Sequence, residues 1–153
     1  MTDPFRRPTF GPALIYKDPA AALDWLEAAF GFECSMVIRD GAGMIVHAEL
    51  RFGDGYIMIG PEWTSEVASP ASMGGRNTQS VHVLLEGDVD AHCERARSAG
   101  AVILQEPEDQ FYGDRAYRAK DPEGHLWSFA RPVRRITREE AERASGLQIE
   151  GWP

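Results

Sequence analysis

The sequence predicts an α+β fold made of two tandem copies of one unit, each with a strand, a helix and three further strands. The main observation is a set of landmarks that recur in the same order. Each copy has an Asp that opens a helical segment, a Gly that ends it and a Gly in a turn between two strands. The pairs are Asp18 and Asp88, Gly31 and Gly100, and Gly55 and Gly124. Helical periodicity in one segment of each copy and strand patterns around it support the same βαβββ repeat.

The first copy begins with a short strand at 13–16. Asp18 then caps a helix with Pro19 at its first position, where the backbone amides lack partners. The apolar residues of this helix recur at helical spacing and should face a sheet; they are Ala22, Leu26, Ala29 and Phe30. Further strands are predicted at 32–39, 44–52 and 56–60. In the middle one, apolar Val46, Ala48, Leu50 and Phe52 alternate with His47, Glu49 and Arg51.

The second copy repeats this order after a segment rich in proline, glycine and serine. Its predicted elements are strands at 80–85 and 101–105, a helix at 88–99, and a final strand pair at 115–120 and 125–130 around the turn Asp121-Pro122-Glu123-Gly124. The expected divisions are residues 1–60 for the first module with an arm at 1–10, 61–77 for a linker, 78–131 for the second module, and 132–153 for a tail. Thr137 and Glu140 form a capping-box pattern that predicts a short helix in the tail, packed on the outside of the protein.

Composition excludes several classes of protein. The 153-residue chain has a formal net charge of −8 and no basic stripe with interleaved aromatics, which disfavours nucleic acid as a partner. The amino-terminal segment has no apolar run of the signal-peptide kind, and no stretch is long enough to span a membrane. Cys34 and Cys93 are expected to be buried free thiols, and the cytoplasm is the expected compartment.

Several motifs resemble the vicinal oxygen chelate superfamily, which includes glyoxalases, bleomycin-resistance proteins and extradiol dioxygenases. They are HAEL and FGDGYIMIG in the first half, and VHVLLEGDVDAHCERARSAGA, YGDR and DPEGHLWSFA in the second. The resemblance covers roughly residues 10–131. It implies that the two sheets curve into a cup, an incompletely closed mixed β-barrel with the helices outside. It also implies a homodimer, since such cups are commonly completed by pairing of two chains.

The resemblance further implies where a metal would bind. Metal-dependent members use His, Glu or Gln side chains on the first and last strands of each half. The matching positions here are His82 and Ser128 in the second half, and Gly11 or Pro12 and Ile59 in the first. Only His82 is a good ligand, so the sequence favours a metal-free site. His82 is then a hydrogen-bonded polar residue, with a role as general base as the catalytic alternative.

A rival interpretation keeps a divalent metal such as zinc, nickel, manganese or iron. It would recruit His47, Glu49, His125 or Glu62 beside His82. His47 and Glu49 share one face of their strand, but an outward, solvated face is the preferred interpretation. His92 is expected to be exposed on its helix. None of these histidines has the spacing of a known metal motif.

Without a metal, the cup is predicted to be a small-molecule pocket with apolar walls. Its expected lining is Ile57, Ile59, His82, Leu84, Leu126 and Ser128. Trp63 on the linker and Phe111 and Tyr112 on the second loop are candidates to close the mouth and stack on a flat ligand. Arg115 either positions an anion or forms an internal ion pair. Trp127 is expected to pack beneath a helix.

Two functions therefore stand against each other. The favoured one is a bleomycin-resistance-like binding protein without catalytic activity, which sequesters an aromatic or cationic compound. The alternative is a metal-dependent lyase, isomerase or dioxygenase, whose chemistry would need a Lewis acid. A metal-free enzyme with His82 as its base is a third, weaker possibility. The scaffold alone does not choose among them.

Overall fold

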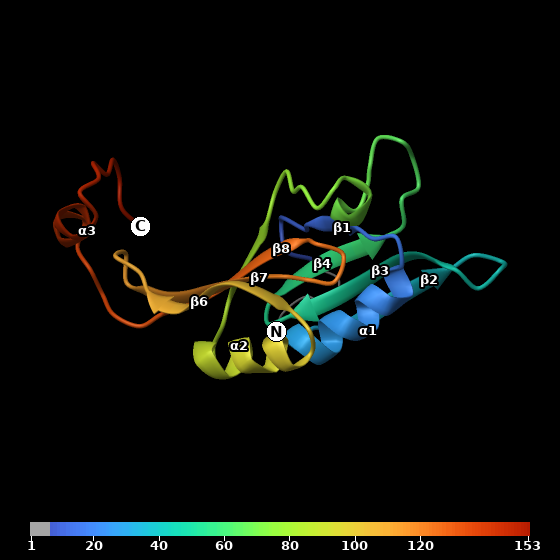
Figure 1. Ribbon diagram of the computed structural model, residues 1–153, viewed down its shortest axis with the longest axis horizontal. Helices are drawn as coiled ribbons and strands as arrows, with labels where there is room; N and C mark the ends of the chain where they lie inside the picture. The colour runs from blue at the N-terminus through green and yellow to red at the C-terminus, as the bar shows by residue number, and fades with distance from the viewer. Residues whose placement is uncertain (1–6) are drawn as a thin grey trace.

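The computed structural model describes residues 7–153, in which two four-stranded sheets are each built from one half of the chain (Figure 1). The first half contains β1 (Ala13–Ile15), α1 (Pro19–Phe30), β2 (Glu33–Arg39), β3 (Ile45–Phe52) and β4 (Gly55–Gly60). A linker with one short 3₁₀ turn, Pro70–Ser72, leads to β5 (Val81–Leu84), α2 (Val89–Ser98), β6 (Val102–Asp109), β7 (Asp114–Lys120) and β8 (Leu126–Pro132). The tail carries α3 (Arg138–Ser145).

Both sheets have the same mixed topology. The strand orders are β1-β4-β3-β2 and β5-β8-β7-β6, with the first and last strands of each half parallel and the other neighbours antiparallel. The sheets are not closed onto each other within the chain. The fold is therefore the α+β tandem βαβββ arrangement that the repeat predicted.

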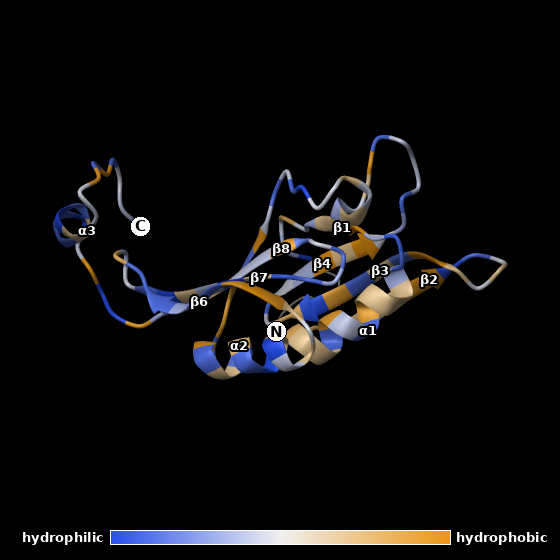
Figure 2. Ribbon diagram, in the orientation of Figure 1, coloured by the Kyte–Doolittle hydropathy of each residue, from blue (hydrophilic) through white to orange (hydrophobic). Residues whose placement is uncertain are grey.

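The local sequence signals account for the helix ends. The Asp18 carboxylate accepts a hydrogen bond from the amide of Ala21, and Gly31 ends α1 in a left-handed conformation. In the tail, Thr137 and Glu140 make both hydrogen bonds of a capping box. Figure 2 shows α1 as the most apolar of the three helices, whereas α2 and α3 are largely hydrophilic.

The main core lies on the side of the sheets covered by α1 and α2 and is shared by both halves. Phe30 at the end of α1 packs against Trp127 and Phe129 of β8, with ring centroids 5.3 and 4.6 Å apart. Trp127 is fully buried beneath α1, as its position opposite Ser128 predicted. Since α1 buries its end against the second sheet, the two modules share one core.

The β7–β8 turn also joins the two halves. The Asp121 carboxylate accepts hydrogen bonds from the Tyr16 hydroxyl at 2.7 Å and from the Trp127 indole at 3.1 Å, as well as from the backbone amides of Glu123 and His125. The Glu123 carboxylate accepts the Lys17 and Asp18 amides and the hydroxyl of buried Ser69. One turn therefore fixes the start of α1 and the linker.

The structure differs from expectation in the middle strand of the first module, at one cysteine and in the tail. Val46 is exposed and Ile45 is buried, because the β2–β3 register shifts between His47 and Ile45 and reverses the alternation there. Cys34 is exposed, although Cys93 is buried, where burial raises the pKa of its thiol to about 11. The tail helix was expected to pack on the outside of the protein, but Figure 1 shows α3 set apart, beyond the end of β6.

Candidate ligand-binding site

Strand register identifies the side chains that occupy corresponding places in the two sheets. On the sheet faces opposite the helices, Ala13 of β1 is paired with Met58 of β4, and His82 of β5 is paired with Ser128 of β8. The first-half equivalents of His82 and Ser128 are therefore Ala13 and Met58. The expected equivalents, Gly11 or Pro12 and Ile59, lie one or two residues away from the positions that the strand pairing gives.

Ile57 and Ile59 do not line the open face, contrary to expectation. Both are buried in the core, where Ile57 is paired with Leu50 and Ile59 with Ala48, on the side that α1 covers. The one-residue offset is decisive because neighbouring strand residues point to opposite faces. Met58 and Tyr56 take their place on the open face of the first sheet.

On the open face of the second sheet, the Nδ1 atom of His82 lies 2.6 Å from the Ser128 hydroxyl oxygen. His82 is exposed, and Leu84, two residues further along β5, has 60% of its surface exposed. Ala130, the partner of Leu84, is buried. Two of the predicted site residues are thus in contact, on a face where His82 and Leu84 are exposed among residues 7–153.

The open face of the first sheet holds a buried carboxylate. Glu49 is only 7% exposed, forms an ion pair with Arg7 and lies 3.5 Å from Nε2 of His47. Burial opposes its ionisation, but the hydrogen bonds from Arg7 and His47 prevail and lower the pKa of Glu49. The expectation of a solvated strand face is therefore wrong for Glu49. Sequence reasoning missed Arg7 and Tyr56 because their closeness depends on the path of the arm.

The donor set at the four equivalent positions does not suit a divalent metal. Ala13 offers no donor, Met58 a soft thioether and Ser128 a neutral hydroxyl, which leaves His82 as the one good ligand for such an ion. Within residues 7–153, no three His, Cys, Asp or Glu side chains gather in a way that suits metal binding. The rival candidate His125 instead directs Nε2 at the Ile15 carbonyl, 2.7 Å away. Glu62 accepts the amide of Ser69.

A pocket of about 700 Å³ lies where the linker folds over the seam between the two sheets. It is lined by parts of β1, the linker, Val81, His125 and Leu126. Asn77 holds the linker here, because its side chain accepts the amide of Leu126 and donates to the Gly124 carbonyl. Of the predicted lining residues, this pocket contains Leu126.

The predicted mouth residues lie far from one another. Trp63 is 73% exposed on the linker, whereas Phe111 and Tyr112 belong to the β6–β7 turn, where their rings are in contact. Figure 1 shows this turn next to the tail, away from the linker. Within one chain they do not close the same opening. Arg115 forms ion pairs with Asp90 and Asp109, which is the internal role that the sequence left open.

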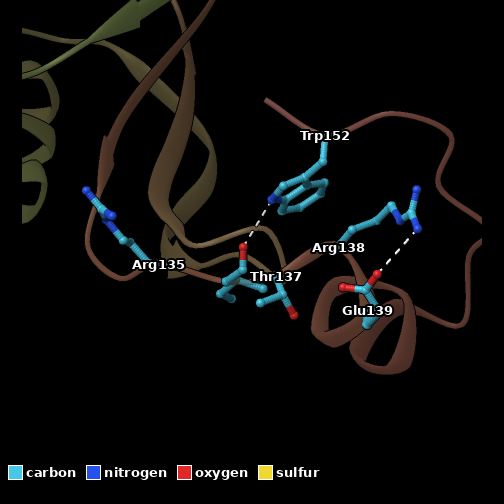
Figure 3. A pocket seen from close by; sticks show the side chains of 6 residues that line it. Arg135, Thr137, Arg138, Glu139 and Trp152 are labelled. Carbon is cyan, nitrogen blue, oxygen red and sulfur yellow. Dashed lines mark hydrogen bonds and ion pairs between the residues drawn. The ribbon is translucent and has the colours of Figure 1, made fainter.

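Two further hollows lie elsewhere, and the second of them includes Leu84, another of the predicted lining residues. A pocket of about 490 Å³ in the tail is lined by residues 135–139 and Trp152, whose indole donates to the Ile136 carbonyl (Figure 3). Another, of about 550 Å³, borders His92. His92 is not exposed as expected: its Nε2 lies 2.8 Å from the Phe30 carbonyl and its Nδ1 lies 2.6 Å from the Tyr117 hydroxyl. Burial lowers its pKa, with Arg95 adding to the effect.

Known proteins share both the sequence and the fold of this chain. The chain is 32% identical over 148 residues to the uncharacterized protein Mb0911c of Mycobacterium bovis, covering 94% of this chain and 96% of the relative. The crystal structure of TioX from Micromonospora sp. ML1 matches with a TM-score of 0.65 and 37% identity, over 81% of this chain and 99% of that one.

Two further findings fix the family. A glyoxalase/bleomycin resistance protein/dioxygenase family enzyme from Burkholderia phytofirmans PsJN has the same fold, with a TM-score of 0.61 at 19% identity, over 79% of this chain and 95% of that one. Residues 10–129 match the family model described as Glyoxalase/Bleomycin resistance protein/Dioxygenase superfamily. The chain therefore belongs to the glyoxalase/bleomycin resistance protein/dioxygenase superfamily.

Proposed function

We propose that this protein binds and sequesters a small aromatic or cationic compound, without a metal ion, on the open faces of its two sheets. The observation that carries the proposal is the set of side chains at the four equivalent positions: Ala13, Met58, His82 and Ser128. A lyase, isomerase or dioxygenase that polarises adjacent substrate oxygens needs a Lewis acid held by several donors. One imidazole and one hydroxyl do not provide such a set.

We propose further that two copies of the chain complete the binding cup. The open sheet faces and strand edges carry exposed apolar side chains, which in water favours burial against another surface. They include Val37, Ile38, Leu84, Val102 and Leu104. A homodimer that pairs these surfaces would bury these side chains.

The charge of the protein supports a cationic ligand rather than an anionic one. A net charge of −8 attracts cations at long range, and the open face carries the Glu49 carboxylate, which already holds a cation, the Arg7 guanidinium. Among residues 7–153, no helix has the length and apolar character that crossing a bilayer requires. The cytoplasm remains our proposed location.

The proposal is tested by binding and metal analysis on the same preparation. Thermal midpoints are measured against a panel of aromatic cations, neutral aromatics and the divalent ions of zinc, nickel, manganese and iron. A ligand that binds only the folded protein raises the midpoint, and we expect aromatic cations to do so and metals not. The divalent ions should likewise leave the midpoint of His82→Ala unchanged.

The opposite result would support the metal-dependent alternative. A metal at about one ion per cup that is lost in His82→Ala would overturn the metal-free proposal. Sedimentation measures the oligomeric state; we expect a dimer, and a monomer would contradict the proposal that two copies complete the cup.

A further inference from the structure

The described part of the amino-terminal arm, residues 7–12, reaches the open face of the first sheet. The Pro12 carbonyl accepts the amide of Met58 at 2.8 Å, which extends the β1–β4 pairing by one residue. Gly11 lies against the Tyr56 ring so closely that a side chain there would overlap the phenol. Arg7 then reaches Glu49, 42 residues away in the sequence.

The Arg7 guanidinium is held by two kinds of contact. One is the ion pair and hydrogen bond with the Glu49 carboxylate. The other is the Tyr56 ring, whose centroid lies 5.5 Å from the guanidinium carbon. A buried carboxylate beside an aromatic face is the combination that recognises organic cations, because each attracts positive charge and the ring tolerates a weakly hydrated ion. Glu49 and Tyr56 therefore form a cation site that is filled from within the chain.

The two sides of this contact differ in how firmly they are built. Glu49 lies on β3 and Tyr56 on the neighbouring strand β4, where Glu49 is paired with Met58 and Tyr56 with Arg51. The strand pairing therefore fixes the positions of both residues. Arg7 lies on an arm outside the strand ladder, and 55% of its side chain is exposed. Its withdrawal would break the contacts with Glu49 and Tyr56 but no strand pairing. The site is fixed, and its occupant is a tethered group.

We propose that Glu49 and Tyr56 form the cation-recognition subsite of the ligand site, and that Arg7 is a tethered competitor which the guanidinium or ammonium group of the ligand displaces. This inference rests on the proposed function, in which the open sheet faces bind a small compound. It narrows the ligand class to organic cations. The arm then sets the minimum affinity that a ligand needs, because the ligand must displace the Arg7 guanidinium, which is held nearby at an effective concentration of roughly millimolar.

A purely structural ion pair is the competing explanation. In that case Arg7 only neutralises the charge that burial makes costly at Glu49, and removing it would destabilise the sheet without creating a site for small cations. The two explanations differ in what they predict for Arg7→Ala in the presence of a guanidinium compound.

The experiment uses the full chain and two simple probes of equal size, ethylguanidinium and neutral ethylurea. Dissociation constants are measured by NMR titration for the wild type, Arg7→Ala and Arg7→Lys. Arg7→Ala should bind ethylguanidinium about tenfold more tightly than the wild type, as removal of a tethered competitor predicts. Arg7→Lys keeps a competing cation and should resemble the wild type. Ethylurea should bind none of them measurably.

Two second-site variants locate the effect. Arg7→Ala/Glu49→Gln should lose the gained affinity, and Arg7→Ala/Tyr56→Leu should lose several-fold of it. Glu49→Gln keeps the side-chain shape, and circular dichroism verifies that each variant is folded. Equal ethylguanidinium affinity in the wild type and Arg7→Ala, or a gain that survives Glu49→Gln, would overturn the subsite. A higher ethylguanidinium affinity in Arg7→Ala, together with no compound of the larger panel that raises the thermal midpoint, would support the subsite but contradict the proposed function.

Discussion

The two sheets share a topology but present different open faces. At equivalent positions the first sheet has Ala13 and Met58, and the second has His82 hydrogen-bonded to Ser128. The first face is covered in part by the amino-terminal arm through Arg7, whereas Leu84 on the second is largely exposed. The comparison shows that a duplicated scaffold keeps its core while each open face acquires its own chemistry.

The last hairpin turns of the two sheets, β3–β4 and β7–β8, also differ in length and in the groups that they contact. The β3–β4 turn is short, and Asp54 in it is exposed. The β7–β8 turn is longer, and its Asp121 and Glu123 bond to groups from the first module and the linker. One copy of the turn only reverses the chain, and the other also joins the modules.

The largest expected loss of stability comes from a substitution in the β7–β8 turn. Asp121→Asn places an amide where the Trp127 indole and Tyr16 hydroxyl need a charged acceptor. Because buried donors lose a charged partner, we expect a loss of about 3 kcal/mol in the free energy of unfolding. The matched Asp54→Asn in the exposed turn should change it by less than about 0.5 kcal/mol. Urea unfolding measures both, and equal losses would contradict the assigned difference.

The next effect compares the β2–β3 and β6–β7 turns. Gly43 and Gly113 both have positive φ, but a Cβ at Gly43 would meet open space, whereas one at Gly113 would lie 2.5 Å from the Arg134 carbonyl oxygen. Gly43→Ala should cost about 1 kcal/mol, from backbone strain alone. Gly113→Ala should cost about 1–3 kcal/mol more, from overpacking against the start of the tail. Thermal unfolding compares the two, and similar midpoints would show that the tail gives way freely.

A smaller effect concerns His92, which joins α2 to the end of α1 and to β7. Its lowered pKa means that, below the ordinary value of about 6.5, the unfolded chain binds more protons than the folded one. Stability should therefore be complete above this pH and decrease as the pH falls towards the folded-state pKa. Glu49, whose pKa is also lowered, contributes only at lower pH, below its ordinary 4.5. His92→Gln should flatten the curve of stability against pH just below about pH 6.5; an unchanged slope there would assign the pH dependence to other groups.

The smallest effect is expected at the His82–Ser128 pair. Because His82 is exposed, Ser128→Ala should change the free energy of unfolding by no more than about 0.5 kcal/mol. Chemical unfolding verifies this, with Met58→Leu as the control on the first sheet. A loss of more than about 1 kcal/mol in the free energy of unfolding would show that the hydrogen bond between His82 and Ser128 stabilises the sheet, rather than serving ligand binding.

The sequence by itself determined the repeat, the helix ends and the turns, because these depend on local signals such as Asp18, Pro19 and the capping box of Thr137 and Glu140. It also determined the family, through the motifs in the two halves. Strand faces were less secure: a register shift exposed Val46, and one residue of offset moved Ile59 into the core.

Only the tertiary structure decided which distant groups meet. The burial of Glu49, the bridge made by His92 and the approach of Arg7 to Tyr56 join residues tens of positions apart. No local pattern encodes such contacts, because they follow from how strands pair and where the arm crosses the sheet. Residue types and spacing specify the elements, whereas the side chains that face one another depend on packing in three dimensions.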